Sequence, residues 1–491
     1  MQRCGFLLAC LILATITGAG GQSISVYQTT PDLLEALSQR ETLKFSAKVD
    51  PRQTAPLITV DDGQRFQEID GFGASMTDSA AWLFAKKLTS AQTDETFKAI
   101  FSRKEGIALS FLRQPIGSSD LAVTFYSFDD LCQQTDKACT TPDGASDPDL
   151  THYSLAHDQE YILPLLKKAL ALNPAIHVML TPWSPPEWMK TPASMLGSNP
   201  DTKGPSSLRP EFYGAFAKYL VKSVEGYQAA GVPVYALSVQ NEPLYAPPTY
   251  SGMQMFAKEQ VDFFANALGP AMTAAGLKTK VMAYDHNWDR PEYPEEVLKD
   301  AKAGALAAGT AWHHYAGDPS VMTEFHNKFL QKDEWVTESS GGAWQKGNVL
   351  AAEAAELIAV TRNWAKSYVL WALATDQNYG PRVGGCDTCR GLVTIDLSKP
   401  GNPVKLEPDY YVLGQASKFL LPGAVRIASN ELAGTQVKDV AFSNPDGTIV
   451  LYALNAGTTS QTIRIGFHEK TVATILPSGS VATFVWKLRS N

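Results

Sequence analysis

The sequence Ser238-Val239-Gln240-Asn241-Glu242-Pro243 closes a short apolar run, Val234 to Val239, with an acidic residue and a proline. Proline lacks the N–H donor that a strand interior needs, so the strand is expected to end here and to leave the Glu242 carboxylate at the edge of its sheet. Barrel enzymes carry their catalytic groups at this end of their strands. The stretch therefore predicts a parallel barrel with Glu242 in its active site.

A second apolar run ends in the same way. The segment Glu334-Trp335-Val336-Thr337-Glu338-Ser339-Ser340-Gly341 places Glu338 at a strand end. Glycoside hydrolysis requires such a pair of carboxyl groups, one kept protonated and one kept ionised. Each glutamate alone has an ordinary alternative, a helix cap or a loop salt bridge. The two contexts together favour a glycoside hydrolase.

Between residues 66 and 412, helix-like and strand-like segments alternate. About eight such pairs, without a dinucleotide-binding glycine pattern, favour an α/β fold, a (β/α)8 TIM barrel, over a doubly wound sheet. The predicted strands span residues 107–113, 177–181, 234–239, 280–284, 311–314, 334–338 and 367–371. The predicted helices span residues 79–87, 158–172, 209–231, 253–276, 295–308 and 348–364.

Both ends of the chain have the pattern of β-structure. Residues 22–65 contain short runs of alternating apolar and polar positions, and residues 413–491 repeat this pattern with turns at Asn444-Pro445-Asp446-Gly447 and Pro477-Ser478-Gly479. A period of two is typical of strands with one buried face. Neither end has enough strands for a sheet of its own, so both are predicted to form one all-β sandwich side domain.

Residues 1–21 are predicted to be a signal peptide. Arg3 supplies a positive charge, Phe6 to Ile16 an apolar core, and Thr17-Gly18-Ala19 the small residues of a cleavage region. This apolar run is too short to span a bilayer and no later run is long enough, so no integral membrane segment is expected in the mature chain. The expected location is secreted or periplasmic. A lipoprotein cleavage box ending at Cys10 is the alternative, which the apolar residues after Cys10 disfavour.

The net charge bears on the kind of partner, and the cysteine spacing bears on how the cysteines are used. The chain has 42 Lys and Arg against 50 Asp and Glu, a formal net charge of −8, so nucleic acid is not an expected partner. Beyond the signal peptide the cysteines form two local pairs, Cys132 with Cys139 and Cys386 with Cys389. In an oxidising compartment these pairs favour loop disulfides. The alternative is a zinc or redox site at Cys386 and Cys389, although a structural zinc needs four ligands.

Other strand ends carry polar or aromatic side chains suited to a sugar site. They lie in the segments Ser110 to Asp120, Leu180 to Met189, Ala311 to Tyr315 and Ser367 to Trp371. A glutamate that accepts hydrogen bonds from Arg113 and Tyr315 would stay ionised and act as a nucleophile. A glutamate in more apolar surroundings, near Trp183, would have a raised pKa and act as an acid. These residues alone do not say which glutamate takes which role.

In this order, the motifs resemble glycoside hydrolase family 30, the family of lysosomal glucosylceramidase and its bacterial and fungal relatives. The resemblance covers nearly the whole mature chain. It rests on Phe66 to Asp78, Arg113 to Asp120, Pro182-Trp183-Ser184-Pro185-Pro186, Asn241-Glu242-Pro243, Thr337-Glu338, Tyr410 to Pro422 and the C-terminal strands.

The resemblance implies a retaining mechanism on a TIM barrel with a β-sandwich beside it. By motif, Glu242 matches the acid/base and Glu338 the nucleophile. Asn241 matches the residue that holds the substrate 2-OH, and Tyr315 the tyrosine that hydrogen-bonds the nucleophile. The other matching positions around the cleaved sugar are Arg113, Asp120, Trp183 and Trp371. Neither a metal nor an organic cofactor is implied, because two carboxyl groups do the proton and covalent work.

Three positions stay open. Asp78 is assigned to the outer hydroxyls of the sugar, with the N-cap of the first helix as the alternative. His314 is assigned to the pocket, although the sequence allows His313, His314 or neither. Where relatives have Trp-Asn-Leu-Ala, this chain has Trp371-Ala372-Leu373-Ala374, so a polar group is missing near the floor of the sugar site. This departure leaves the role of Trp371 and the choice of substrate open.

The expected substrate is a β-linked glucoside, glucan or glycolipid, with exo or endo action left open. Residues 384–391 form a loop stapled by a cysteine pair, placed where it would wall the pocket or shape an acceptor site. The alternatives are a β-xylan- or fucoside-directed hydrolase of the same family, a metal-dependent hydrolase and a non-catalytic carbohydrate-binding barrel. The presence of Glu242, Glu338, Asn241 and Arg113 favours an enzyme.

Overall fold

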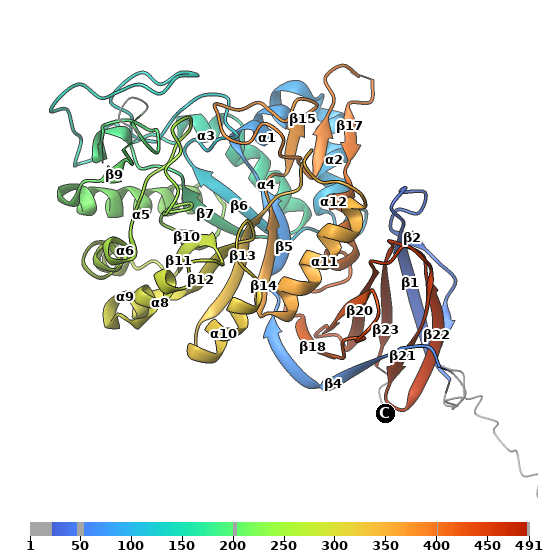
Figure 1. Cartoon of the computed structure of the whole chain (residues 1–491). Coiled ribbons are helices and arrows are strands. Elements are labelled where there is room, and N and C mark those ends of the chain that lie inside the picture. The colour runs from blue at the N-terminus through green and yellow to red at the C-terminus, as the bar shows by residue number, and fades with distance from the viewer. Residues whose placement is uncertain (1–21, 47–53, 200–203, 400, 489–491) are drawn as a thin grey trace, which may run out of the picture.

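A barrel domain and a β-sandwich lie side by side in the computed structural model (Figure 1). The structure describes residues 22–46, 54–199, 204–399 and 401–488. The predicted signal peptide at residues 1–21 lies outside this part of the chain. Within it, no helix has the length and apolar character needed to cross a membrane.

Eight parallel strands close the barrel in the order β10-β11-β12-β13-β14-β5-β6-β7. The predicted α/β TIM barrel is therefore confirmed. The strands are β5 Gly71–Ser75, β6 Phe111–Ile116, β7 His177–Pro182, β10 Val234–Ser238, β11 Lys280–Asn287, β12 Ala307–His313, β13 Asp333–Ser339 and β14 Ala365–Leu370.

Helices connect successive strands around the outside of the barrel (Figure 1). They are α1 Asp78–Trp82, α2 Ser90–Phe101, α3 Ala156–Glu160, α4 Ile162–Leu172, α5 Tyr213–Ala229, α6 Ala257–Phe263, α7 Gly269–Ala274, α8 Glu292–Lys299, α9 Ala301–Leu306, α10 Ser320–Lys328, α11 Val349–Arg362 and α12 Pro408–Ser417. The π-helical turns Leu83–Lys87 and Phe264–Leu268 continue α1 and join α6 to α7.

Short elements lie within the loops that follow the barrel strands. They are β8 Lys190–Thr191, β9 Ser207–Leu208, β15 Ala374–Asp376, β16 Val393–Ile395, β17 Val404–Leu406 and the 3-10 turns Glu187–Met189 and Pro210–Phe212. The strands β15, β16 and β17 pair into a small sheet of their own.

Seven barrel strands each send one buried apolar side chain into the barrel interior, which makes the interior a packed core. These side chains are Phe111, Met179, Ala236, Met282, Ala311, Trp335 and Val369. The eighth strand, β5, has Gly73 at this level, paired with Phe111 and Val369. A Cβ atom at Gly73 would lie 1.6 Å from the carbonyl oxygen of Phe111, so the close approach of β5 and β6 requires glycine.

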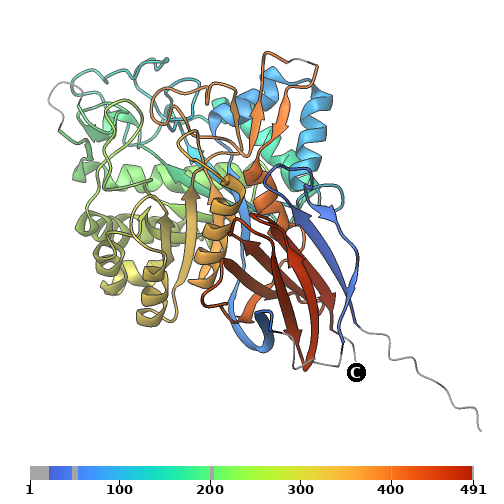
Figure 2. The same cartoon turned by 45° about the vertical axis from the view of Figure 1, so that its right-hand side comes forward.

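Strands from both ends of the chain form the sandwich, in the order β2-β1-β23-β20-β19-β18-β4-β21-β22, with β3 also paired to β1. Figure 2 shows the N-terminal strands beside the C-terminal ones. The strands are β1 Ser23–Thr29, β2 Ser38–Gln39, β3 Leu43–Lys44, β4 Leu57–Glu68, β18 Val425–Ser429, β19 Val437–Ser443, β20 Thr448–Asn455, β21 Gln461–Phe467, β22 Lys470–Leu476 and β23 Val481–Lys487. The predicted sandwich of both termini is confirmed.

The predicted domain boundaries at residues 66 and 413 fall inside elements. β4 keeps its ladder with β18 as far as the pair Glu68 and Val425. α12 continues to Ser417 and packs between the barrel strand β5 and the sandwich strand β23. We therefore place the boundaries just before β5 and after α12.

Candidate active site

Five buried or nearly buried titratable side chains meet at the carboxyl ends of the barrel strands. They are Arg113 on β6, Glu242 after β10, Asp285 on β11, His313 on β12 and Glu338 on β13. The backbone φ is 47° at Glu242 and 68° at Asp285, a left-handed conformation that is uncommon outside glycine. Such conformations cost free energy and cluster at active sites. The backbone N–H of Glu242 donates to the carbonyl of Asp285 at 3.0 Å, which ties the two residues together.

Glu338 is held by two donors. The guanidinium Nη1 of Arg113 lies 2.5 Å from Oε2, and the Tyr315 hydroxyl donates to Oε1 at 2.9 Å. Arg113 Nη2 also donates to Asn241 Oδ1 at 2.7 Å, so the guanidinium is fixed. Both donors stabilise the ionised carboxylate, which is the arrangement expected around a nucleophile.

Glu242 faces Glu338 across a short gap. Its Oε1 lies 3.0 Å from Nδ1 of His313, and the nearest carboxylate oxygens of Glu242 and Glu338 lie within 4.8 Å of each other. Retaining glycosidases place their carboxyl groups about 5–5.5 Å apart, whereas inverting enzymes leave about 6.5–9.5 Å for a water molecule. The separation fits the retaining arrangement.

The pKa values of Glu242 and His313 differ from the expectation that the acid residue has a raised pKa. Burial raises the pKa of Glu242, but the hydrogen bond from His313 and the surrounding positive charges outweigh burial and lower the pKa below its ordinary value. Burial lowers the pKa of His313, but the charge of Glu338 and the two carboxylate hydrogen bonds raise the pKa to about 9. The sequence-based expectation of a raised pKa for the acid is therefore wrong for the free pocket, where the imidazole holds the proton.

Asp285 is a central residue that the sequence analysis missed. Its carboxylate accepts from Arg113 at 2.9 Å, His313 Nε2 at 3.0 Å, Thr337 Oγ1 at 2.6 Å and Thr181 Oγ1 at 3.1 Å. Burial opposes ionisation, yet these partners hold the pKa of Asp285 far below its usual range. The signal was present, because Asp285 directly follows the predicted strand 280–284 as Glu242 follows its own strand.

A pocket of about 340 Å³ opens over the two glutamates. Trp183 and Trp371 stack in its wall with ring centroids 4.9 Å apart, and the Arg113 guanidinium lies 4.8 Å from the Trp183 ring. Ala372 is fully buried beside these two rings, so it adds only a methyl group there. The lining residues are Asp120, Trp183, Asn241, Glu242, Tyr250, Tyr315, Glu338, Trp344, Trp371, Cys386 and Cys389.

The structure therefore brings most of the predicted site residues together in one pocket. Arg113 contacts two of them, Asn241 and Glu338. Asp120 is 5% exposed, and burial together with the charge of Glu338 raises its pKa to about 7. Tyr250 and Trp344 were not predicted, because both come from irregular loops where no periodic pattern marks a position.

Asp78 does not line the pocket, contrary to its predicted contact with the sugar. Its buried carboxylate accepts from the Val123 N–H at 2.8 Å, from Nε2 of His157 at 2.8 Å and from the Tyr161 hydroxyl. The N-cap alternative is also wrong for this residue, because the Thr77 side chain caps α1 by accepting from the Ala80 N–H. Three internal donors thus occupy the Asp78 carboxylate.

His314 is a second correction. Its Nδ1 lies 2.8 Å from Glu356 Oε1, and its Nε2 accepts from the backbone N–H of Ser340 at 3.2 Å. Successive residues of a strand point to opposite sides, and His313 rather than His314 faces the barrel interior. The site histidine is therefore His313.

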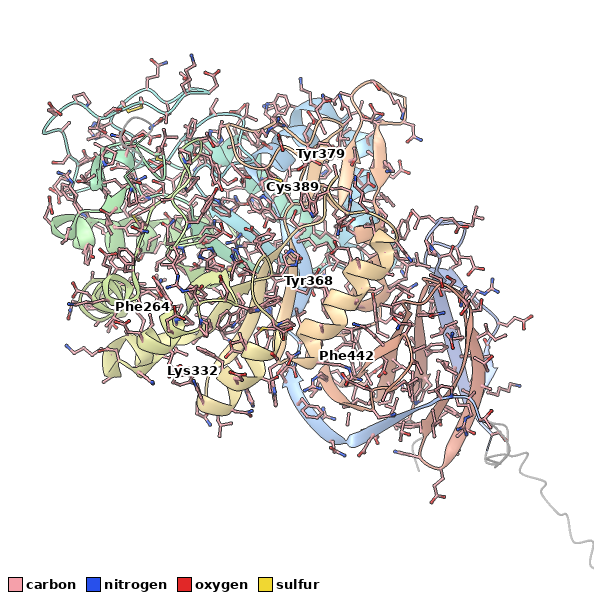
Figure 3. All side chains as sticks on the ribbon, viewed as in Figure 1. Phe264, Lys332, Tyr368, Tyr379, Cys389 and Phe442 are labelled. Carbon is pink, nitrogen blue, oxygen red and sulfur yellow. A yellow bond between two sulfur atoms is a disulfide. The ribbon has the colours of Figure 1, made fainter. Side chains whose placement is uncertain are left out.

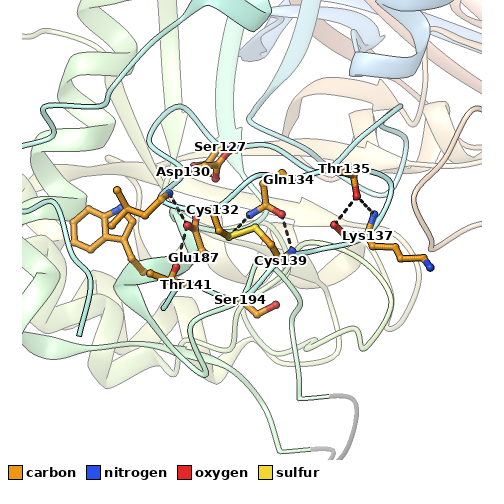
Figure 4. The surroundings of a disulfide bond; sticks show 12 residues. Ser127, Asp130, Cys132, Gln134, Thr135, Lys137, Cys139, Thr141, Glu187 and Ser194 are labelled. Atoms are coloured by element: carbon orange, nitrogen blue, oxygen red, sulfur yellow. Dashed lines mark hydrogen bonds between the residues drawn. A yellow bond between two sulfur atoms is a disulfide. The ribbon is translucent and has the colours of Figure 1, made fainter. Parts of the chain in front are cut away.

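Both cysteine pairs form disulfides. Cys132 and Cys139 have Cα atoms 6.1 Å apart, and Cys386 and Cys389 have Cα atoms 5.6 Å apart. Figure 4 shows the first disulfide in a loop where Gln134 contacts both cysteines. The second disulfide lies at the pocket. Because its two sulfur atoms are bonded to each other, the zinc alternative for this pair does not hold.

Among the described residues, one group has the spacing of metal ligands, namely Glu242, His313 and Glu338. Two of its members are the facing carboxylates, and the Arg113 guanidinium already lies against Glu338. A cation there would meet this fixed positive charge, so the donor set does not fit a metal site.

The comparison with protein-family models agrees with this geometry. Residues 69–420 match the glycosyl hydrolase family 30 TIM-barrel domain, and residues 423–484 match the family 30 β-sandwich domain. The chain belongs to glycoside hydrolase family 30. It is thereby an O-glycosyl hydrolase of the retaining class, in agreement with the carboxyl separation.

Individual family 30 proteins resemble the chain over most of its length. An endo-1,6-β-D-glucanase of Neurospora crassa is 35% identical over 401 residues, 79% of either chain. A solved structure of an endo-β-1,6-glucanase superposes with a TM-score of 0.82 at 31% identity, covering 95% of this chain and 100% of that one. The lysosomal acid glucosylceramidase of Mus musculus is 27% identical over 463 residues, 88% of this chain and 84% of that protein.

Proposed function

We propose that this family 30 enzyme is an endo-β-1,6-glucanase that works by double displacement. The observation that carries the mechanism is the separation of the two carboxyl groups, within 4.8 Å, with Arg113 and Tyr315 both donating to Glu338. The substrate rests on the relatives, because the two 1,6-glucanases are more similar in sequence than the glucosylceramidase.

In the first step, the Glu338 carboxylate attacks the anomeric carbon and the bond to the leaving oxygen breaks. Glu242 gives its proton to that oxygen. Because the imidazole of His313 holds the shared proton in the free pocket, the proton moves from Nδ1 to Glu242 across 3.0 Å as the substrate binds. The leaving chain thus departs as a neutral alcohol, and a glycosyl ester remains on Glu338.

In the second step, Glu242 acts as a base. It takes a proton from a water molecule whose oxygen attacks the anomeric carbon, and the bond to Glu338 breaks. The product keeps the β-configuration. Asn241 supports both steps, because its Oδ1 accepts from Arg113 and its amide is left to hold the 2-OH of the sugar.

Purified protein would be assayed on pustulan, gentio-oligosaccharides, p-nitrophenyl β-glucoside, glucosylceramide and xylan, with Glu338→Gln as the control. We expect pustulan to be cut into oligomers and the control to be inactive. Turnover of only the small glucoside or the lipid would identify an exo-acting enzyme and overturn the endo assignment. Full activity of Glu338→Gln would overturn the mechanism.

The stereochemistry is a separate test of the mechanism. Proton NMR during hydrolysis should show the β-anomer of the new reducing end before mutarotation. Appearance of the α-anomer first would mean inversion and would exclude Glu338 as a nucleophile.

We also propose that the protein is exported. Residues 1–21 have the signal-peptide pattern, and two disulfides are stable in an oxidising compartment. Expression of the full chain followed by N-terminal sequencing of extracellular or periplasmic protein should give a start near residue 22. Recovery of only uncleaved cytosolic protein would contradict this proposal.

A further inference from the structure

Trp344 is a large aromatic side chain that the fold leaves exposed at the pocket. It lines the pocket and is 48% exposed, and among the described residues it is the only tryptophan exposed to this extent. By contrast, the wall tryptophans Trp183 and Trp371 are 3% exposed. Removing an indole from water contributes strongly to binding, so an exposed one beside a substrate pocket marks a surface that a ligand covers.

The segment that carries Trp344 directly follows β13, the strand of Glu338, and is hydrogen-bonded to the Cys386–Cys389 loop. Gly342 and Cys389 form an antiparallel bridge, the Ala343 N–H donates to the carbonyl of Thr388 at 3.0 Å, and the Arg390 N–H donates to the carbonyl of Gly341 at 2.9 Å. The indole lies against the backbone of Gly342, where a Cβ atom would come within 2.0 Å of its ring. The indole orientation therefore depends on this pairing.

The Arg390 side chain connects the same two segments to helix α12. The Arg390 guanidinium donates to both carboxylate oxygens of Asp409, at 2.8 and 3.0 Å, and to Gln345 Oε1 at 2.8 Å. Asp409 is buried on α12, and the bidentate geometry is the strong form of a charge-assisted hydrogen bond. The Trp344 segment and the disulfide loop are thus both anchored to α12, a part of the rigid scaffold.

The other side of the disulfide loop packs against the residues of the sugar site. The Cys386 N–H donates to Asp120 Oδ2 at 3.3 Å, and a Cβ atom at Gly385 would lie 2.4 Å from the Cβ of Asp120. A Cβ atom at Gly384 would lie 2.4 Å from the carbonyl oxygen of Thr249. Figure 3 places Cys389 at the end of the barrel opposite Lys332, which precedes β13, and so at the carboxyl ends of the strands. The loop is thus wedged between Asp120 and Trp344.

We propose that Trp344, held by the Cys386–Cys389 loop, is a stacking platform for a second glucosyl unit of the glucan chain, next to the unit that is cleaved. This inference rests on the proposed β-1,6-glucanase function. The wall rings Trp183 and Trp371 are buried, and the exposed Tyr315 is tied to Glu338 by its hydroxyl. The Trp344 ring, by contrast, is open to solvent. The C–H face of a pyranose matches an exposed aromatic face, and the ring needs no rearrangement to receive it, because its segment is already fixed.

The test compares a substrate that reaches the platform with one that does not. Gentiotetraose extends beyond the cleaved unit, and β-glucosyl fluoride has only that unit and a fluoride leaving group. For Trp344→Ala, we expect the ratio of kcat/KM for gentiotetraose to kcat/KM for glucosyl fluoride to fall about 10- to 100-fold, mainly through KM. Trp344→Phe keeps an aromatic face and should recover much of the ratio.

The disulfide has a matched control in the same chain. Cys386→Ser/Cys389→Ser should lower the same ratio in the same direction as Trp344→Ala. Cys132→Ser/Cys139→Ser removes the disulfide that does not line the pocket, and its ratio should equal that of the wild type. Melting temperatures of all variants would identify a general loss of folding.

An unchanged ratio in Trp344→Ala would overturn the platform. This includes the case in which kcat/KM falls equally on both substrates. A low ratio in Trp344→Ala with an unchanged ratio in Cys386→Ser/Cys389→Ser would overturn the role of the disulfide loop. Wild-type enzyme that cleaves glucosyl fluoride but not gentiotetraose would instead refute the proposed β-1,6-glucanase function, and the inference would fall with it.

Discussion

At the scale of single residues, Arg113 organises the site. Its side chain is fully buried, and its charge is compensated by Glu338 and Asp285 at 2.5 and 2.9 Å. Burial disfavours the cation, but the two carboxylates outweigh burial and raise the pKa of Arg113 above its usual value. A buried charge without a partner strongly destabilises the folded protein. Arg113 therefore holds both carboxylates in place.

The roles of the two glutamates can be separated by chemical rescue. In Glu338→Gly, azide would replace the missing nucleophile in a single displacement and should give an α-glycosyl azide. In Glu242→Gly, azide would attack the intact glycosyl ester on Glu338 and should give a β-glycosyl azide. Both variants should lose about 10³-fold or more of kcat on an unactivated glucan.

The measurement is product analysis by NMR with an activated aryl β-glucoside. Exchanged anomers between the two variants would exchange the two roles. Rescue of neither variant, with both folded, would contradict double displacement.

The histidine beside Glu242 gives a prediction on pH. In the wild type the pair of His313 and Glu242 holds one proton that is lost only as the pH approaches the raised pKa of His313, about 9. In His313→Asn, Glu242 alone must hold the proton, so the alkaline limb of kcat/KM should move to lower pH by about one unit or more. The pH profile of kcat/KM on gentiotetraose, whose leaving alcohol needs the proton, checks this.

The acid limb of the same profiles is the internal control. His313→Asn leaves the Arg113 and Tyr315 contacts of Glu338 in place, so this limb should move less than the alkaline limb. An alkaline limb at the wild-type position would show that His313 does not supply the proton.

At the scale of elements, Lys190 links two of the loops around the pocket. Its fully buried Nζ lies 2.7–3.0 Å from four oxygens, those of the Ser184 hydroxyl and of the Met195, Leu196 and Gly252 carbonyls. Burial lowers the pKa of Lys190, but four acceptors around one nitrogen match the ammonium form with its three donors. The side chain thus joins the loop after β7 to the loop after β10.

Lys190→Met should destabilise the protein by about 3 kcal/mol or more, because three buried carbonyls and the Ser184 hydroxyl each lose a hydrogen bond from a charged donor. Chemical denaturation monitored by tryptophan fluorescence measures the change. Lys218→Met, at a half-exposed lysine, should change stability by less than about 0.5 kcal/mol. A Lys190→Met variant as stable as Lys218→Met would show that the four contacts contribute little.

The prediction of elements succeeded where the hydrophobic period was clear. The strand at Val234 and the helix at Asn348 follow their patterns closely, whereas α2 Ser90–Phe101, α10 Ser320–Lys328 and β5 Gly71–Ser75 were not predicted. β5 has two glycines and no β-branched residue, because it packs too closely on β6 for side chains at Gly73. The predicted helix 295–308 was too long, because its last residues begin β12 at Ala307.

At the scale of the whole molecule, Arg362 joins the barrel to the sandwich. From the end of α11 it donates to the Asp439 carbonyl at 2.5 Å, to Asp439 Oδ1 at 3.0 Å and to the Ser429 carbonyl at 3.1 Å. Burial raises the pKa of Asp439, and the Arg362 charge and the Ser429 hydroxyl oppose that rise. Loss of the guanidinium would therefore leave a buried carboxyl without its main partner.

Arg362→Met should lower the free energy of unfolding by about 3–5 kcal/mol. Adding Asp439→Asn should restore part of the loss, because the uncompensated charge is removed. Arg40→Met, at a surface ion pair with 52% exposure of the arginine side chain, is the control and should cost less than about 1 kcal/mol. Calorimetry would compare five proteins, namely the wild type, Arg362→Met, Asp439→Asn, the double variant and the Arg40→Met control. Additive effects of the Arg362 and Asp439 changes would contradict a direct coupling.

The sequence by itself determined the fold class and singled out the two facing glutamates, because both follow from local patterns. Apolar runs of strand length end in Glu242 and Glu338, and chain order then places these ends on one face of a barrel. Only the tertiary structure decided which neighbours each group has. It placed His313 rather than His314 beside Glu242 and gave the Asp78 carboxylate three internal donors. It also paired Asp285 with Arg113 and paired the Trp344 segment with the Cys386–Cys389 loop. Each of these contacts joins segments far apart in the chain, and its distance depends on packing that no local pattern records.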